Sequence, residues 1–208
     1  GQRHHRPAQL ADGRIFAWIC RLCLILCLLE SAGFYLDGRS FLGARAAALV
    51  CNVLLFMLGA LPAYLWVCCL NSRIRRRWRL LAALPAAGVM ALSAANLFVD
   101  VFFGITADNV YYRAPLAWLP YVVTLAYLAG GTVLIKLRQR RTGRYVYMPV
   151  SAFLLPVYLG VALQLLFYGL SFIWVAAALG LTSLYICLQC ELTFRDPLSN
   201  LYNRSFLL

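Results

Sequence analysis

The stretch IFAWICRLCLILCLLESAGFYL, from Ile15 to Leu36, decides the fold class of this chain. It is almost entirely apolar, and as an α-helix rising about 1.5 Å per residue it is long enough to cross a hydrocarbon core of about 30 Å. Five similar runs follow it, at residues 46–70, 80–103, 116–135, 148–168 and 171–190. The pattern predicts an all-α polytopic membrane protein, a bundle of six transmembrane helices.

The composition excludes an ordinary water-soluble domain. The 208 residues are 63% hydrophobic and only 12% charged, whereas soluble domains are nearer half apolar and a quarter charged. The net charge of +12 does not indicate nucleic-acid binding, because the basic residues form short clusters between apolar runs rather than one solvated basic face. We therefore expect the lipid bilayer, and no nucleic acid, as a partner.

Four apolar runs contain a proline, which in lipid predicts a kink or local widening of the helix rather than its end. These prolines are Pro62, Pro85, Pro120 and Pro156. The last two runs are separated only by residues 168–170 and predict a tight helical hairpin. A count of five spans fails, because about 40 apolar residues are too many for one crossing.

The basic residues predict the orientation. Those on one side of the predicted membrane are Arg3, Arg6, Arg14, Arg73, Arg75, Arg76, Arg77, Arg79, Lys136, Arg138, Arg140, Arg141, Arg144, Arg195 and Arg204. The other side holds only Arg39, Arg45 and Arg113. Positive charge favours the cytoplasmic side, so both termini are expected in the cytoplasm and the protein in a plasma membrane.

Four polar side chains in the apolar runs share one expected depth, the outer third of the bilayer. They are Glu30, Asn52, Asn96 and Gln164. Asp100 and Tyr168 are expected one helical turn further out, on the faces that carry Asn96 and Gln164. Polar residues in lipid are costly, so a shared depth on four helices favours a common purpose.

The outer loop at residues 108–113 carries further polar and aromatic groups, among them Asn109, Tyr112 and Arg113. One interpretation is a pocket for a small extracellular ligand, formed by this loop and the polar layer, with Glu30 or Asp100 as its charged anchor. The other is hydrogen bonding between helices together with an interfacial aromatic belt. The sequence leaves both open.

No catalytic set and no metal site is expected in these residues. His4 and His5 lie in the N-terminal arm, and no phosphate-binding loop is present. The eight cysteines include two Cys-x-x-Cys pairs, Cys20 with Cys23 and Cys187 with Cys190. Because they lie within apolar runs and have no histidine nearby, we interpret them as small packing residues.

The residues after the sixth run carry a family motif. Asp196-Pro-Leu-Ser-Asn-Leu-Tyr-Asn203-Arg204 resembles the Asp-x-Leu-Thr-x-Leu-x-Asn-Arg element that opens GGDEF domains, the diguanylate cyclases. Asp196, Asn203 and Arg204 match its polar positions, Ser199 replaces the usual threonine, and Ser205 stands where a second arginine is common. Residues 109–113, 164–169 and 185–189 are also similar to six-span sensor regions found ahead of such domains in Gram-positive bacteria.

The resemblance implies three segments: a cytoplasmic arm at 1–14, a six-helix sensor domain at 15–190, and a signalling linker with the first residues of a truncated GGDEF domain at 191–208. It implies that Asp196, Asn203 and Arg204 couple the signal to the output. It also implies a homodimer, with Mg and GTP used only by the missing cyclase domain and no cofactor in these residues.

The leading hypothesis is therefore a transmembrane sensor that binds a small extracellular ligand and controls a diguanylate cyclase. The alternatives are the sensor of a histidine kinase, a receptor without enzymatic output and a small transporter. A transporter is disfavoured because no internal repeat or pair of broken helices stands out.

Overall fold

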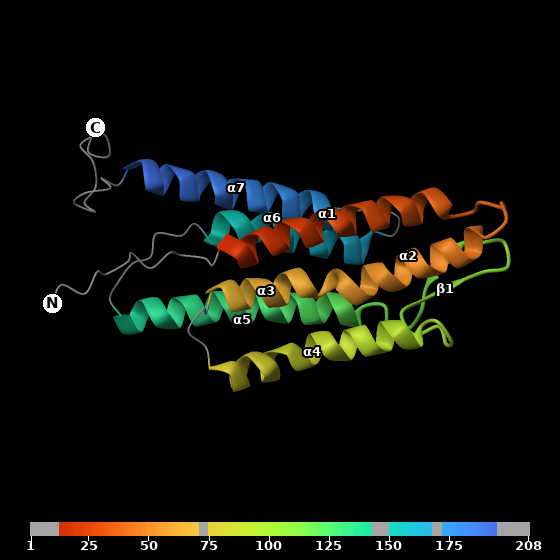
Figure 1. Cartoon of the computed structure of the whole chain (residues 1–208), viewed down its shortest axis with the longest axis horizontal. Helices are drawn as coiled ribbons and strands as arrows, with labels where there is room; N and C mark the ends of the chain where they lie inside the picture. The colour runs from red at the N-terminus through yellow and green to blue at the C-terminus, as the bar shows by residue number, and fades with distance from the viewer. Residues whose placement is uncertain (1–12, 71–74, 143–149, 168–171, 195–208) are drawn as a thin grey trace. The chain divides into compact units, whose positions relative to one another are not determined.

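A computed structural model describes residues 13–70, 75–142, 150–167 and 172–194. The elements are α1 (Gly13–Leu36), α2 (Ala44–Gly59), α3 (Leu61–Leu70), α4 (Arg76–Ala95), β1 (Phe103–Ile105), β2 (Tyr111–Arg113), α5 (Leu119–Thr142), α6 (Val150–Leu166) and α7 (Ile173–Phe194) (Figure 1). The chain divides into two compact units, residues 1–137 and 138–208. The mainly helical part of the prediction is confirmed.

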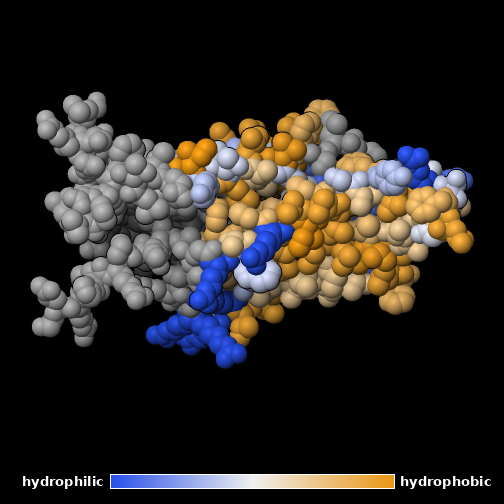
Figure 2. All heavy atoms as spheres, turned by 45° about the horizontal axis from the view of Figure 1, so that its top comes forward, coloured by the Kyte–Doolittle hydropathy of each residue, from blue (hydrophilic) through white to orange (hydrophobic). Residues whose placement is uncertain are grey.

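Three stretches in the described residues are long and apolar enough to cross a membrane: Arg14–Leu36, Ala44–Cys69 and Arg76–Ala95. Shorter apolar helical stretches cover Leu119–Leu134, Leu154–Gln164 and Ile173–Ser183. Large apolar side chains are exposed along these helices, and hydrophobic residues cover much of the face shown in Figure 2. Such faces suit a lipid solvent, whereas in water they would favour aggregation.

One face of α1 packs inside the first unit. Ile19, Cys23, Leu26 and Glu30 are buried, and their spacing of four, three and four residues places them on one stripe of the helix. This stripe faces α2 and α3, which are the helices that α1 contacts. Leu24 and Leu28, on the other side of α1, are exposed.

Two of the expected proline effects are visible in the first unit. The second apolar run divides at Ala60, and Pro62 follows in the first turn of α3. Pro85 lies inside α4, and the phenol oxygen of Tyr127 in α5 enters the helix beside it. That oxygen accepts a hydrogen bond from the Ala86 N–H (3.1 Å) and donates one to the Ala82 carbonyl (2.6 Å). Tyr127 therefore satisfies the two backbone groups that a regular α-helix would join to each other.

Two sequence-based expectations were wrong. The third apolar run does not stay helical to Phe103, because α4 ends at Ala95 and the chain turns at Asn96. Asp100 therefore does not lie one turn above Asn96 on a helix. Pro120 does not kink its helix either, since α5 begins at Leu119 and a proline in the first turn interrupts no helical hydrogen bond.

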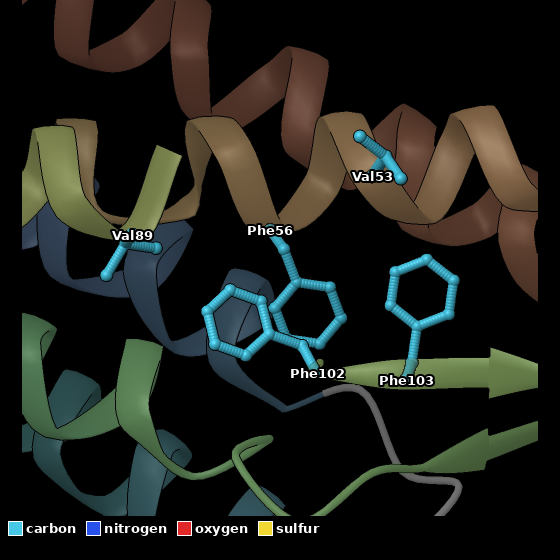
Figure 3. Close-up of a cluster of buried hydrophobic side chains, with 5 residues drawn as sticks. All are labelled: Val53, Phe56, Val89, Phe102 and Phe103. Atoms are coloured by element: carbon cyan, nitrogen blue, oxygen red, sulfur yellow. The ribbon is translucent and has the colours of Figure 1, made fainter. Parts of the chain in front are cut away.

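After α4 the chain returns into the unit as an antiparallel hairpin of β1 and β2. Phe102 and Phe103 are fully buried, and both rings stack on Phe56 of α2 at centroid distances of 5.5 Å. Figure 3 shows the two rings reaching from the start of β1 toward α2, with Val53 and Val89 in the same cluster. The hairpin thus fills the space between helices that a continued α4 would have left.

The second unit contains the helical hairpin of α6 and α7, which confirms the close pairing of the last two runs. Gly160 is buried where the two helices approach. A Cβ atom at this position would lie 2.6 Å from the Cβ of Ala176 and 3.1 Å from the Phe172 carbonyl oxygen. Only glycine allows this approach, as is common where helices pack in lipid. Pro156 lies inside α6, as expected.

We expect Tyr127→Phe to lower the free energy of unfolding by about 1–2 kcal/mol, because the Ala82 carbonyl and the Ala86 N–H lose their partner in an apolar setting. Thermal unfolding in detergent micelles measures the change. Tyr185→Phe is the matched control, since the side chain of Tyr185 is exposed. Equal stability of both variants and the parent would show that the Tyr127 hydroxyl has no structural role.

Candidate functional site

The candidate site is built on the segment between α4 and α5. Its strands pair Phe103 with Arg113, Gly104 with Tyr112, and Ile105 with Tyr111. The turn is closed by hydrogen bonds between Thr106 and Val110, and Asn109 adopts a left-handed φ of 60°. Asparagine tolerates this conformation better than other non-glycine residues, so the sequence itself favours a turn here.

Asn96 fastens the segment to the end of α4. Its Oδ1 accepts hydrogen bonds from the backbone N–H groups of Val101 (3.1 Å), Phe102 (2.7 Å) and Phe103 (3.3 Å). Its Nδ2 donates to the Phe103 carbonyl (2.8 Å). The amide predicted to face a ligand is thus buried and engaged by its own loop.

Asn109 fastens the other end of the hairpin to the end of α1. Its side-chain Nδ2 donates to the backbone carbonyls of Leu36 (2.9 Å) and Arg39 (2.8 Å). The backbone carbonyl of Asn109 accepts from the Gly38 N–H (2.8 Å). Asp37 adds a bond, because its Oδ1 accepts from the Tyr111 N–H (2.8 Å). We call the bonds made by Asn109 and Asp37 the hairpin clamp.

The Asn109 side chain also carries a buried oxygen. Its Oδ1 is shielded from solvent and has no hydrogen-bond partner among the described residues. Buried acceptors are normally satisfied by protein or ordered water, so one left over marks a place where a donor can bind. The clamp therefore holds the hairpin and retains one unused acceptor.

Asp100 and Tyr112 form a pair on the exposed side of the hairpin. The Tyr112 hydroxyl donates to Asp100 Oδ2 at 2.6 Å, and this bond is the main reason why the pKa of Tyr112 is raised. The ring of Tyr112 lies over Gly104, where a Cβ atom would collide with it. A side chain at position 104 would therefore displace the Tyr112 ring from the position in which it lies over Gly104.

Arg113 does not share that side. Successive residues of a strand point to opposite faces, so Arg113 lies on the face of Tyr111, whose ring stacks on Phe103 at 5.6 Å. Arg113 is half-buried. Tyr112 and Arg113, which the sequence suggested as neighbours in one site, are thus separated by the strand.

The deeper polar residues belong to helix contacts. Glu30 is buried on the packed stripe of α1. Asn52 donates from Nδ2 to the Ala48 carbonyl of its own helix (2.9 Å). Its amide lies close to Gly33 of α1, where a Cβ atom would be 3.7 Å from Nδ2. Asn52 therefore sits at a close approach of α1 and α2, but its hydrogen bond stays within α2 rather than joining the two helices.

Gln164 belongs to the second unit. Its side chain is buried, and Oε1 accepts a hydrogen bond from the Ile173 N–H at the start of α7 (3.2 Å). It thereby satisfies one of the free amides of that helix end. Tyr168, Asp196, Asn203 and Arg204 lie outside the described residues.

Sequence reasoning missed Asp37 and the two phenylalanines of the returning loop. Asp37-Gly38 follows an apolar run and is a turn signal that could have marked the clamp. Phe102 and Phe103 resembled the end of a long apolar helix, so hydropathy alone gave no reason to separate them from it. In the described part of the chain, Cys20, Cys23, Cys27, Cys51 and Cys68 are free thiols.

Asn109→Gly keeps the left-handed backbone but removes the carboxamide. We expect it to release the hairpin from α1, because the Leu36 and Arg39 carbonyls lose their donor, at about 1–3 kcal/mol per buried unsatisfied group. Hydrogen exchange at the Gly38 and Tyr111 amides should quicken. Ala107→Gly, at an exposed turn position, is the control. Unchanged exchange in the Asn109 variant would mean that the clamp does not hold the hairpin.

The Tyr112 and Asp100 pair predicts a pH dependence. A raised pKa means that the neutral phenol is favoured in the fold. The bond therefore stabilises the hairpin below the ordinary tyrosine pKa of 10.0 and is lost as the pH rises through the raised value. The Tyr112 contribution to the tyrosinate absorbance is the part that Tyr112→Phe removes, and it should titrate above pH 10.0. In a protein that also carries Asp100→Ala, the pKa of Tyr112 should move back toward 10.0. No movement in that background would exclude Asp100 as the cause.

Comparison with protein-family models, with curated proteins and with solved structures found no significant match. The assignment of the site therefore rests on the geometry of the hairpin, its clamp and the Asn96 contacts. The similarity to the start of a GGDEF domain rests on residues 196–204 alone.

Proposed function

We propose that this chain is a sensory module of a bacterial plasma membrane, which binds a small ligand at its outer end and controls a C-terminal diguanylate cyclase. The observation that carries the proposal is the double attachment of the hairpin. Asn109 holds it on the end of α1, and Asn96 holds its first strand on the end of α4. A ligand on the hairpin therefore acts on two helices at once.

The ligand surface that we propose is the exposed Asp100 and Tyr112 pair. A carboxylate and a phenol suit a small polar molecule that carries hydrogen-bond donors. The buried Oδ1 of Asn109 is a separate unused acceptor in the clamp. Arg113 lies on the opposite, inner face of the hairpin and is not part of this surface. In the first unit, Glu30, Asn52 and Asn96 support the fold rather than line the surface, and Gln164 holds the start of α7 in the second unit.

In the membrane, the module has six spans with both termini in the cytoplasm. The three long apolar stretches and the three shorter ones support this count. Within the first unit, the arginines at 75–79 begin α4 and the basic residues at 136–140 end α5, which runs back along α4. The acidic residues Asp37, Asp100 and Asp108 lie at the opposite ends of these helices, as the orientation requires.

Ligand changes the output only if it binds two states of the module with different affinity. The hairpin offers such a difference, because tightening or loosening the clamp changes how α1 and α4 are joined. The signal leaves through α7 and residues 191–208, where Asp196, Asn203 and Arg204 form the joint with the cyclase domain. A homodimer of that domain, using Mg and GTP, would synthesise cyclic di-GMP.

The test uses cells that make the intact native protein. We expect cyclic di-GMP to rise above the level of cells with an empty vector. Asn109→Gly and Asp100→Ala should each shift that level by about fivefold or more, since coupling free energies between sites are typically about 1–3 kcal/mol. Asp108→Ala, an equivalent change at an exposed hairpin position, should leave the level unchanged.

Two outcomes would contradict the proposal, and they differ. No cyclic di-GMP above the empty-vector level would exclude the cyclase output. A normal level that none of the hairpin variants alters, at equal protein abundance, would exclude the hairpin as the input. Asp196→Ala tests the joint separately, because it should abolish the effect of Asn109→Gly without altering the stability of the hairpin.

A further inference from the structure

Three consecutive large apolar side chains are exposed where α4 ends. Leu97 is 46% exposed, Phe98 88% and Val99 66%. They precede Phe102 and Phe103, which are fully buried in the same short segment. The segment thus buries Phe102 and Phe103 in the core and leaves Leu97, Phe98 and Val99 exposed. We call Leu97, Phe98 and Val99 the apolar tip.

The apolar tip continues the exposed face of α4. Leu84, Gly88, Ala91, Ala95 and Phe98 are all exposed, and they are spaced by four, three, four and three residues. The spacing is that of one helical face. The backbone also keeps a helical course to this point, since the N–H groups of Phe98 and Val99 donate to the Ala95 carbonyl at 3.0 and 3.1 Å. The exposed apolar face of α4 therefore runs without a break into the tip.

The position of the tip along α4 matches the edge of a bilayer. Trp78 lies in the first turn of α4, is exposed, and has the Arg77 guanidinium over its ring at 5.8 Å. Such a pair is typical of a membrane interface. The 20 residues of α4 span about 30 Å, the thickness of the hydrocarbon core. If Trp78 marks one interface, Phe98 lies at the other.

A second feature at the same end supports this placement. Trp118 is half exposed directly before α5, and Tryptophan is enriched where a helix meets the interface. Leu97, Phe98 and Val99 are followed by Asp100, whose carboxylate is held by the Tyr112 hydroxyl on the hairpin. The sequence therefore changes from apolar to polar just where the chain turns back toward the hairpin.

We propose that the apolar tip inserts into the outer interface of the bilayer and anchors the root of the hairpin there. The occupant of this surface is lipid, at the boundary between headgroups and acyl chains, where apolar groups insert by about 5–10 Å. The tip is exposed whereas Phe102 and Phe103 are buried, so the bilayer and the aromatic cluster would each hold one part of the same loop. The proposal rests on α4 crossing the membrane but not on ligand binding or cyclase output.

The experiment places one additional tryptophan at a time in the full chain. The variants are Phe98→Trp and Val99→Trp at the tip, Leu84→Trp on the exposed face within α4, and Ala107→Trp in the hairpin turn. Each protein is reconstituted in phosphatidylcholine and phosphatidylglycerol vesicles that contain lipid brominated either near the headgroup or deep in the acyl chain. Subtracting the fluorescence of the parent removes the signal of its five native tryptophans.

At both tip positions, the added fluorescence should be quenched more by shallow than by deep bromines, and little by aqueous acrylamide. Leu84→Trp should be quenched by bromines and not by acrylamide, and Ala107→Trp by acrylamide and not by bromines. Tip variants that behave like Ala107→Trp, while Leu84→Trp lies in lipid, would overturn the anchor alone. Accessibility of Leu84→Trp to acrylamide would overturn both the anchor and the span of α4.

Discussion

The carboxamide of Asn96 joins three successive backbone N–H groups and one carbonyl of the returning loop to the end of α4. Val101 and Phe102 lie outside any helix or strand and Phe103 begins β1, and backbone groups left unpaired away from water are costly. A single side chain thus allows the chain to leave the helix, turn, and re-enter the unit. An apolar residue in its place would leave four backbone partners unsatisfied.

The rest of the outer end follows from that turn. Because residues 101–103 are held, Phe102 and Phe103 can stack on Phe56 and close the space between α2, α4 and α5. Because β1 is fixed by its phenylalanines, β2 pairs with it and carries Asn109 to the end of α1. The same turn places Leu97, Phe98 and Val99 outward. Core packing, the clamp and the apolar tip are consequences of one local contact.

The polar residues of the apolar runs bond to different kinds of backbone group. Asn52 and Gln164 bond to backbone groups of a helix, and Asn96 bonds to a loop. Of these three, only the Gln164 bond joins two helices, as the interpretation of hydrogen bonding between helices expects. The Asp100 and Tyr112 pair is exposed on the hairpin, and the Oδ1 of Asn109 has no hydrogen-bond partner among the described residues. We base the proposed ligand site on the pair, because the hairpin that carries it is attached to two helices.

Hydropathy was enough to determine the number and approximate limits of the apolar helices, because burial in lipid requires long apolar runs whatever their neighbours are. It also indicated the pairing of the last two runs, whereas Pro62 predicted only a kink where the second run divides into α2 and α3. It failed between Asn96 and Phe103, because a buried phenylalanine in a returning loop and a lipid-facing one on a helix are equally apolar. Asn109 bonds to backbone groups seventy or more positions back in the chain, so those bonds exist only once the hairpin meets the end of α1, whereas the Asn96 bonds reach at most seven positions ahead. Tertiary structure therefore decided that Asn96 and Asn109 hold the fold, because hydropathy does not show which backbone groups a polar side chain will meet.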